Sequence, residues 1–124
     1  MKWNIDGSSP LYLQLADDLR YAIICGELPA GARIPSVREL AADSRVNPNT
    51  MQRALFELER EGLVITRGTS GKFVTDDGTA LSEARETALE LLITDFTSRA
   101  SALGFSVEDA VEHVLRRSER KVEE

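Results

Sequence analysis

The 124-residue sequence contains one cysteine, Cys25, and one histidine, His113. A disulfide and a Cys/His zinc site are therefore both excluded. No apolar run approaches the roughly 20 residues of a membrane helix, and Asp6 falls where the apolar core of a signal peptide would lie. We expect a cytoplasmic protein with no membrane partner, in which Cys25 is a buried packing residue and His113 lies on the surface.

Signals of catalysis are also scarce. Gly68 and the pair Gly71-Lys72 resemble part of a phosphate-binding loop, but Thr66 and Phe73 stand where that motif needs Gly and Ser or Thr. The sequence has no carboxylate pair at a recognisable spacing and no glycine-rich cofactor motif. We therefore expect no enzyme, no cofactor and no metal site.

The charge is acidic overall, with 15 basic and 21 acidic residues and a net charge of −6. Taken alone, this balance argues against a nucleic-acid-binding protein, which usually carries a basic patch. The charge is uneven, however. Residues 79–124 hold six basic and ten acidic side chains, whereas residues 31–56 hold four arginines and two acidic side chains. A locally basic element on an acidic body needs an explanation.

Two helices are predicted before residue 45. Ser9 as N-cap, with Pro10 at the first helical position, predicts a helix that ends at Gly26. Ser36 and Glu39 form a capping box, in which two free backbone N–H groups are satisfied reciprocally. This box predicts a short second helix.

A third helix is predicted to begin at Asn47, with Pro48 in the first helical position, and to stop at Gly62. Its apolar residues recur at helical spacing and give one buried stripe: Met51, Ala54, Leu55 and Leu58. Residues 63–67 and 72–75 then predict a β-hairpin around a four-residue, glycine-containing loop. This order of elements is the winged helix-turn-helix plan, so we expect a mainly α fold with a small β-hairpin.

Several ordered motifs resemble one family. The segments Pro35–Ala41, Val46–Leu55 and Leu58–Leu63 closely resemble the DNA-binding domain of GntR-family bacterial transcriptional regulators. Ser9–Leu15 and Gly71–Val74 fit the same pattern. The resemblance covers more than half of the chain and implies a dimeric regulator that binds double-stranded operator DNA.

The DNA contacts implied here come from three places. Arginines can bind phosphates or guanine, the amides of the third helix can bind adenine, and the hairpin loop can reach the minor groove. Many family members carry Arg at the position of Pro48, and some carry Arg at the position of Gln52. The residues that read bases therefore differ, and the operator of another member cannot be assumed for this chain. The DNA-binding candidates are Arg33, Ser36, Arg38, Asn47, Asn49, Thr50, Gln52, Arg53, Arg67, Gly68, Thr69, Ser70, Gly71 and Lys72.

The linker at residues 76–78 divides the chain into a DNA-binding domain of residues 1–78 and a tail of residues 79–124. The tail is predicted to form one helix over residues 80–103 and a second that Ser106 caps. Two helices cannot enclose a typical ligand pocket of about 300 Å3. The short tail resembles the YtrA-type branch, in which it serves dimerisation and the regulator often controls a transporter operon. The dimerisation candidates are Leu81, Ala84, Ala88, Leu91, Leu92, Phe96, Leu103, Val107, Val111, Val114 and Leu115.

The leading hypothesis is a homodimeric repressor whose third helix enters the major groove. The alternative is a winged-helix protein-interaction module that does not bind DNA, which the net charge of −6 favours. A small-molecule effector is left open. Two aromatic residues are undecided: Phe56 either contacts the first helix or stays partly exposed, and Trp3 packs on the domain or at a dimer interface.

Overall fold

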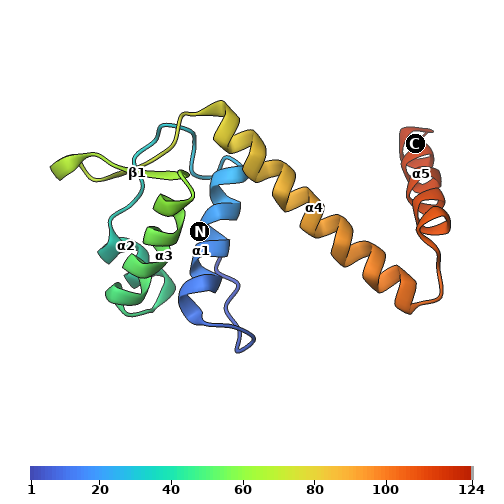
Figure 1. Cartoon of the computed structure of the whole chain (residues 1–124), viewed down its shortest axis with the longest axis horizontal. Helices are drawn as coiled ribbons and strands as arrows, with labels where there is room; N and C mark the ends of the chain where they lie inside the picture. Colours follow the sequence, from blue (N-terminus) through green and yellow to red (C-terminus); the bar gives the residue numbers. More distant parts are fainter. Residues whose placement is uncertain (124) are drawn as a thin grey trace. The chain divides into compact units, whose positions relative to one another are not determined.

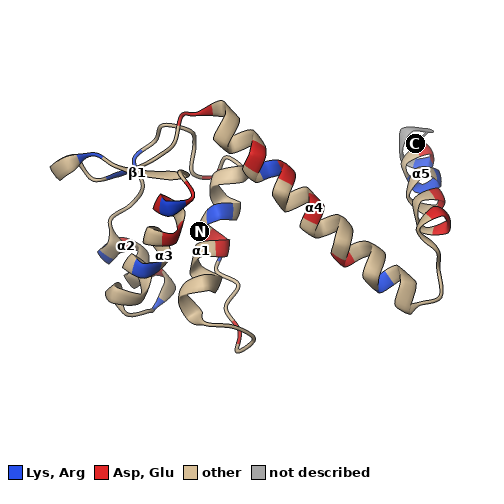
Figure 2. Cartoon of the chain, viewed as in Figure 1, with Lys and Arg blue, Asp and Glu red and all other residues tan. Residues whose placement is uncertain are grey.

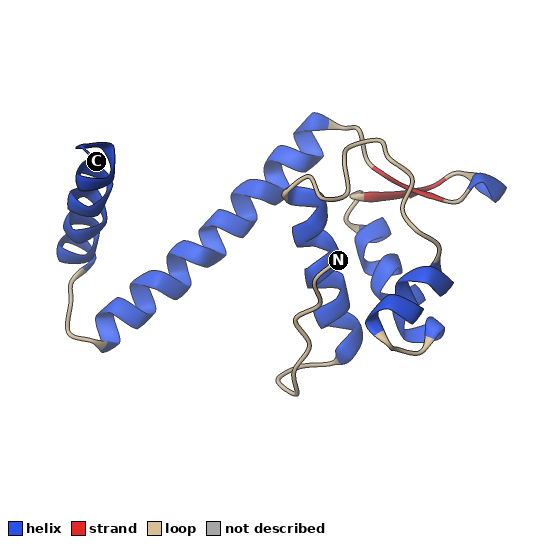
Figure 3. Cartoon of the chain, turned by 180° about the vertical axis from the view of Figure 1, so that it is seen from behind, coloured by secondary structure: helices blue, strands red, loops and turns tan. Residues whose placement is uncertain are grey.

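The computed structural model describes residues 1–123 and is mostly helical with one small antiparallel hairpin, as expected (Figures 1 and 3). The chain forms two compact units, Met1–Ala84 and a second that begins at Arg85. Among the described residues, no helix is long and apolar enough to cross a membrane. The elements in chain order are α1 (Leu11–Ile24), α2 (Val37–Ser44), α3 (Pro48–Arg60), β1 (Val64–Thr66), the 3-10 turn η1 (Gly68–Ser70), β2 (Lys72–Val74), α4 (Gly78–Ala102) and α5 (Val107–Glu123).

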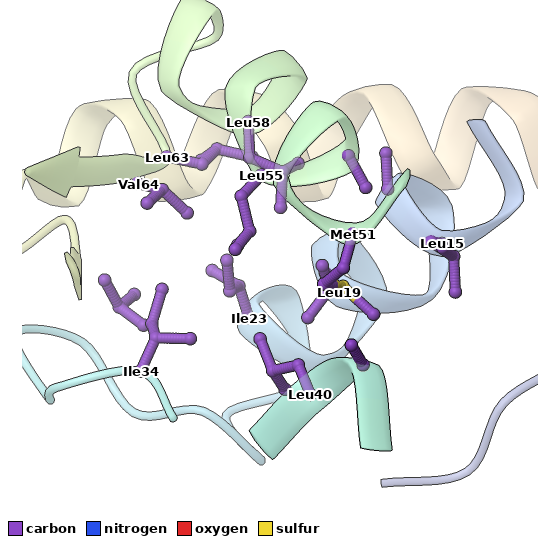
Figure 4. Packing of buried hydrophobic residues seen from close by; sticks show 14 residues of the cluster. Leu15, Leu19, Ile23, Ile34, Leu40, Met51, Leu55, Leu58, Leu63 and Val64 are labelled. Carbon is purple, nitrogen blue, oxygen red and sulfur yellow. The ribbon is translucent and has the colours of Figure 1, made fainter. Parts of the chain in front are cut away.

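The core of the first unit lies between α1, α2 and α3 and continues to the hairpin (Figure 4). The predicted stripe of α3 is confirmed, since all four of its residues are completely buried. Each large apolar side chain removed from water in this way stabilises the fold by about 1.5–3 kcal/mol. The main contributors are Leu15, Leu19 and Ile23 of α1, Leu40 of α2, Met51, Leu55 and Leu58 of α3, and Ile34, Leu63, Val64 and Val74 around the hairpin.

The helix starts agree with the sequence signals for α2 and α3 and differ for α1. Ser36 Oγ accepts a hydrogen bond from the Glu39 N–H at 3.1 Å, which is one half of the predicted capping box. Asn47 caps α3, with Pro48 as its first residue. The N-cap of α1 is Pro10 rather than Ser9. Pro10 has an extended ψ of 137°, so the helix starts one residue later and has no side-chain cap.

The hairpin is shorter than predicted, and a third segment joins it. Thr66 pairs with Lys72, so the strands close before the loop and the 3-10 turn fills most of the connection. Residues 32–34 lie along the other edge of β2: the Ile34 N–H donates to the Lys72 carbonyl at 2.8 Å, and the Val74 N–H donates to the Ala32 carbonyl at 2.9 Å. This pairing, which the sequence analysis did not predict, ties the segment before α2 to the hairpin.

The start of α4 belongs to the first unit. Asp77 Oδ1 accepts hydrogen bonds from the N–H groups of Thr79 and Ala80, at 2.9 and 3.4 Å. Leu81 and Ala84 pack against the core of the first unit. Both were expected on the dimerisation surface; in the structure they are half-buried on the core of their own chain because the compact unit continues through the first turns of α4.

The second unit contains the rest of α4 and α5. Among its described side chains, only Ala100 and Ala110 are buried, with exposed fractions of 9 % and 5 %. Ser106 Oγ accepts from the Asp109 N–H at 3.1 Å, so the predicted cap of α5 is confirmed. The rings of Phe105 and His113 form a T-shaped pair with a centroid distance of 5.5 Å, and His113 is exposed.

Two other predictions on the first unit now have an outcome. The expectation that Cys25 is buried is wrong, because the side chain is exposed. It follows the buried Ile23 by two residues, which places it on the opposite side of the helix end. Trp3 packs against the core of its own unit, and its indole N–H donates to Asp43 Oδ2 at 2.8 Å.

Candidate nucleic-acid interface

Three sides of α3 are covered by other parts of the first unit. Its apolar stripe faces the core. Towards the hairpin, the Glu59 carboxylate accepts hydrogen bonds from Lys72 and from Thr66 Oγ1. Towards α1, the Arg53 guanidinium lies over the Tyr12 ring, 3.8 Å from its centroid. These contacts bracket the helix and leave one face open.

The open face carries Asn49, Gln52 and Phe56, all of which are exposed. Their spacing of three and four residues puts them on one ridge of the helix. An asparagine or glutamine amide can donate to and accept from the edge of adenine in the major groove. The ridge therefore presents two amides that can read bases, followed by an aromatic ring.

The beginning of α3 is suited to an anion. The Asn47 side-chain oxygen accepts from the Asn49 N–H at 2.8 Å, so its capping role is filled. Pro48 has no N–H, and the N–H group of Thr50 donates to the Asn47 carbonyl at 3.0 Å, so the helix start attracts an anion through the positive end of its dipole. Arg45, which has a left-handed backbone conformation with a φ of 60°, is the C-cap of α2 and lies two residues before Asn47. Thr50, half-buried, lies in the same turn.

Five exposed arginines of this region have no acidic partner. In the described part of the chain, no carboxylate oxygen lies within 4.0 Å of these five, although other arginines, such as Arg20, Arg60, Arg99 and Arg116, are paired. Figure 2 shows basic residues on α2, α3 and the hairpin. Positive charge is thus available for phosphates. The five are Arg33, Arg38, Arg45, Arg53 and Arg67.

The hairpin loop positions two of these arginines. The Arg33 guanidinium lies against Gly71, where a Cβ would stand 3.1 Å from Arg33 Nε. Gly71 also has a φ of 109°, a conformation that side chains rarely adopt. Arg67 lies over the Phe73 ring, 5.0 Å from its centroid. Gly68, Thr69 and Ser70 form the exposed turn between Arg67 and Gly71.

Lys72, predicted to contact DNA, is half-buried and forms an ion pair within its own chain. Its ammonium group pairs with the Glu59 carboxylate and donates to Thr66 Oγ1 at 3.0 Å. Burial raises the pKa of Glu59, but the hydrogen bonds from Lys72 and Thr66 and the charge of Lys72 together lower it below its ordinary value. The Glu59–Lys72–Thr66 cluster therefore fastens the hairpin to α3. No local pattern in the sequence indicates this cluster, because its members lie on three different elements.

The remaining predicted residues have defined places. Ser36 is the N-cap of α2, with its hydroxyl bonded to the helix backbone, and Arg38 follows on the exposed side of the first turn. Tyr12, which the structure places under Arg53, was not among the predicted site residues. Its helical register relative to Leu15 and Leu19 is the only signal in the sequence, and it could not identify the partner.

The second unit exposes a broad apolar surface. All predicted dimerisation residues from Leu91 onward are exposed by 44–77 %. Leu89, Ile93 and Phe105, which were not predicted, are exposed as well, by 43–54 %. Ala88 is half-buried. An exposed apolar area of this extent on a folded chain is typical of a protein-protein contact.

Comparison with known proteins gives one consistent result. Residues 11–74 match the family described as bacterial regulatory proteins, gntR family. The uncharacterized HTH-type transcriptional regulator YhcF of Bacillus subtilis is 36 % identical over 107 residues, which cover 86 % of this chain and 88 % of YhcF. The HTH-type transcriptional repressor YtrA of Bacillus subtilis is 36 % identical over 84 residues, or 67 % of this chain and 65 % of YtrA.

A solved structure supports the same assignment. A GntR-family transcriptional regulator from Listeria monocytogenes superposes with a TM-score of 0.81 and is 34 % identical. The superposition covers 90 % of this chain and 98 % of that structure, so it includes the tail as well as the hairpin and the three helices before it.

Proposed function

The chain belongs to the gntR family of bacterial regulatory proteins and is a transcriptional regulator with a helix-turn-helix DNA-binding domain, and from this premise we propose that it is a homodimeric repressor. Two copies, joined through their second units, would bind a pseudo-palindromic operator in bacterial cytoplasm. Occupation of the operator would block access to the promoter. The observation that carries the proposal is the open face of α3 with unpaired arginines around it.

The repressor role is supported by the similarity to YtrA of Bacillus subtilis, which is named a transcriptional repressor. The DNA-contact assignment rests on chemistry. Asn49 and Gln52 offer bidentate amides to adenine, and Arg38 and Arg53 carry unpaired guanidinium groups that suit phosphate or guanine. Arg53 is already positioned by stacking on Tyr12, which reduces the side-chain entropy lost on binding.

The homodimer is supported by the apolar surface of the second unit. Leu91, Leu92 and Leu103 expose more than 60 % of their surface in the single chain. A two-fold partner would cover such a surface and present two recognition helices to half-sites about 34 Å apart. Residue-level assignment of this interface is part of the proposal.

The first experiment measures binding of the full chain to the region upstream of its own operon. Fluorescence anisotropy is recorded against a scrambled duplex of equal length, at several salt concentrations. We expect tighter binding to the upstream region, with affinity that falls steeply as salt rises because phosphate contacts release counterions. Equal affinity for both duplexes at moderate salt would overturn the proposal.

A matched pair of variants tests the site. Arg38→Ala removes an unpaired guanidinium beside α3, whereas Arg99→Ala removes an exposed arginine of the second unit that pairs with Asp95 at 3.1 Å. We expect Arg38→Ala to weaken operator binding and to lower the slope of log affinity against log salt by about one. Arg99→Ala should leave both values unchanged. The same effect in both variants would show that only total charge matters.

A further inference from the structure

Phe56 is a large aromatic side chain with no place in the core. It exposes 56 % of its surface, although its neighbours Leu55 and Leu58 on the same helix are fully buried. Contacts on both sides of α3 fix where it points. Glu59 reaches the hairpin and Arg53 reaches Tyr12, so Phe56 lies between them on the open face, in line with Gln52.

The position of Phe56 along the helix can be compared with the spacing of base pairs. Phe56 follows Asn49 by seven residues, which corresponds to about 10 Å along a helix that rises 1.5 Å per residue. Base pairs are stacked about 3.4 Å apart. When α3 lies in the major groove with its first turn at the bases, the Phe56 ring reaches a point about three base pairs from the Asn49 contact.

The chemistry of that point follows from what the major groove displays. Thymine is the only standard base that presents a methyl group there, and phenylalanine is one of the side chains that contact it. A ring on the open face gains no hydrogen bond from any base, so it favours the base pair that offers apolar surface. Asn49 and Gln52 favour adenine by their amides. The ridge as a whole therefore suits an A·T-rich half-site.

We propose that Phe56 is a specificity-determining residue that recognises the 5-methyl group of one thymine per half-site, about three base pairs from the base contacted by Asn49. The proposal rests on the proposed function, since it needs α3 in the major groove. It assigns a role to a residue that carries neither charge nor hydrogen-bonding groups.

The test uses deoxyuridine, which differs from thymidine only by that methyl group. A duplex is first enriched from random sequences with the full chain, and each of its thymines is then replaced singly by deoxyuridine. We expect one replacement per half-site to weaken binding of the unaltered protein about fourfold. This factor corresponds to about 0.8 kcal/mol, the free energy of burying one methyl group.

Three variants give the test its control. Phe56→Ala should bind the thymine duplex about fourfold or more weakly and should no longer distinguish thymine from deoxyuridine at that position. Phe56→Leu should retain part of the discrimination, because it keeps apolar surface. Tyr21→Ala removes another exposed aromatic ring, 63 % exposed on α1, and should leave the discrimination intact. Thermal unfolding of each variant checks that the fold is retained, as expected for exposed positions.

The outcomes separate the two proposals. Suppose that the unaltered protein enriches a sequence, but that Phe56→Ala loses affinity on every deoxyuridine replacement just as the unaltered protein does. The role of Phe56 is then overturned and the proposed function stands. The role of Phe56 is overturned in the same way if Phe56→Ala changes the oligomeric state and leaves the discrimination unaltered. If the full chain enriches no sequence from the random pool, the proposed function itself fails, and the assignment of Phe56 fails with it.

Discussion

Replacement of Glu59 by glutamine tests whether the hairpin must be fastened to α3 for DNA binding. The carboxylate accepts from Thr66 Oγ1 at 2.8 Å and pairs with Lys72, and both charged side chains are about one-quarter exposed. Hydrogen bonds to charged groups contribute about 1.5–3 kcal/mol when buried, and exposed ion pairs about 0–1 kcal/mol. For this intermediate site, and with an amide oxygen retained, we expect Glu59→Gln to lose about 1 kcal/mol of unfolding free energy.

Glu59→Gln can change DNA binding in two opposite ways, through the loss of a negative charge and through the loss of the link between the hairpin and α3. Removal of a negative charge about 10 Å from a phosphate would strengthen binding by about 0.4 kcal/mol in water before salt screening. Loss of the Glu59–Lys72–Thr66 cluster, which acts as a tether between the hairpin and α3, would weaken binding by up to about 1 kcal/mol, or fivefold. The hairpin would then have to be ordered when it binds the DNA. Since the tether contributes more, we expect Glu59→Gln to bind the operator more weakly.

The assay compares Glu59→Gln with Glu57→Gln by urea unfolding and fluorescence anisotropy. Glu57 is on the same helix with a similarly exposed side chain, 28 % against 26 %, but it pairs with the exposed Arg60 instead of the hairpin. Glu57→Gln should leave operator binding unchanged or slightly stronger. If Glu59→Gln also binds more strongly, the tether has no role in DNA binding and the reasoning is refuted.

The pKa of Glu59 adds a direction with pH. Because the folded state holds this pKa below its ordinary value, the carboxylate stabilises the fold fully above the unfolded pKa. That contribution is lost as the pH falls through the folded pKa. The stability difference between the unaltered protein and Glu59→Gln should therefore be largest near neutral pH and shrink in acid. A difference that grows on acidification would contradict the assigned ion pair.

Three other predictions concern the core, a helix cap and the tail. Leu55→Ala should lower the unfolding free energy by about 2–5 kcal/mol in urea titrations, since Leu55 is fully buried, and a loss below 1 kcal/mol would count against the core assignment. Asn47→Ala should cost about 1 kcal/mol, while Asn47→Asp, which still caps, should cost little; equal losses would argue against capping. If the chain forms the proposed dimer, Val111→Asp should convert it to a monomer in light scattering, whereas Glu112→Ala should not. An unchanged mass for Val111→Asp would remove that residue from the proposed interface.

Local signals predicted the helical part of the fold well. Asn47, Pro48 and Ser36 act within one turn of their own position, so a cap can be read from a few adjacent residues. The stripe from Met51 to Leu58 was equally accessible, because helical periodicity alone decides which residues share a face. Periodicity predicts burial less well at the end of a helix. Cys25 is exposed although Ile23, about half a turn earlier, is buried.

Contacts between distant elements could not be predicted in the same way. Lys72 was predicted to contact DNA because it is basic and follows the hairpin loop. Its ion pair with Glu59, which lies 13 residues earlier on another element, was not predicted. The pairing of Arg33 with Phe73 and the stacking of Arg53 on Tyr12 likewise join segments about 40 residues apart. Such contacts depend on how the elements pack, which a spacing rule does not contain.

The acidic balance of the chain is compatible with DNA binding because charge acts locally. At physiological salt, attraction between exposed charges decays over about 8 Å, so a sum over 124 residues says little about one helix. Around α3, the structure pairs Arg60 with Glu57 and Lys72 with Glu59, while Arg53 keeps an unpaired charge. Fewer free cations mean weaker sequence-independent binding. Under the proposed function, discrimination between sequences then rests more on the groups that face the bases, and the open face offers two amides and one aromatic ring for that role.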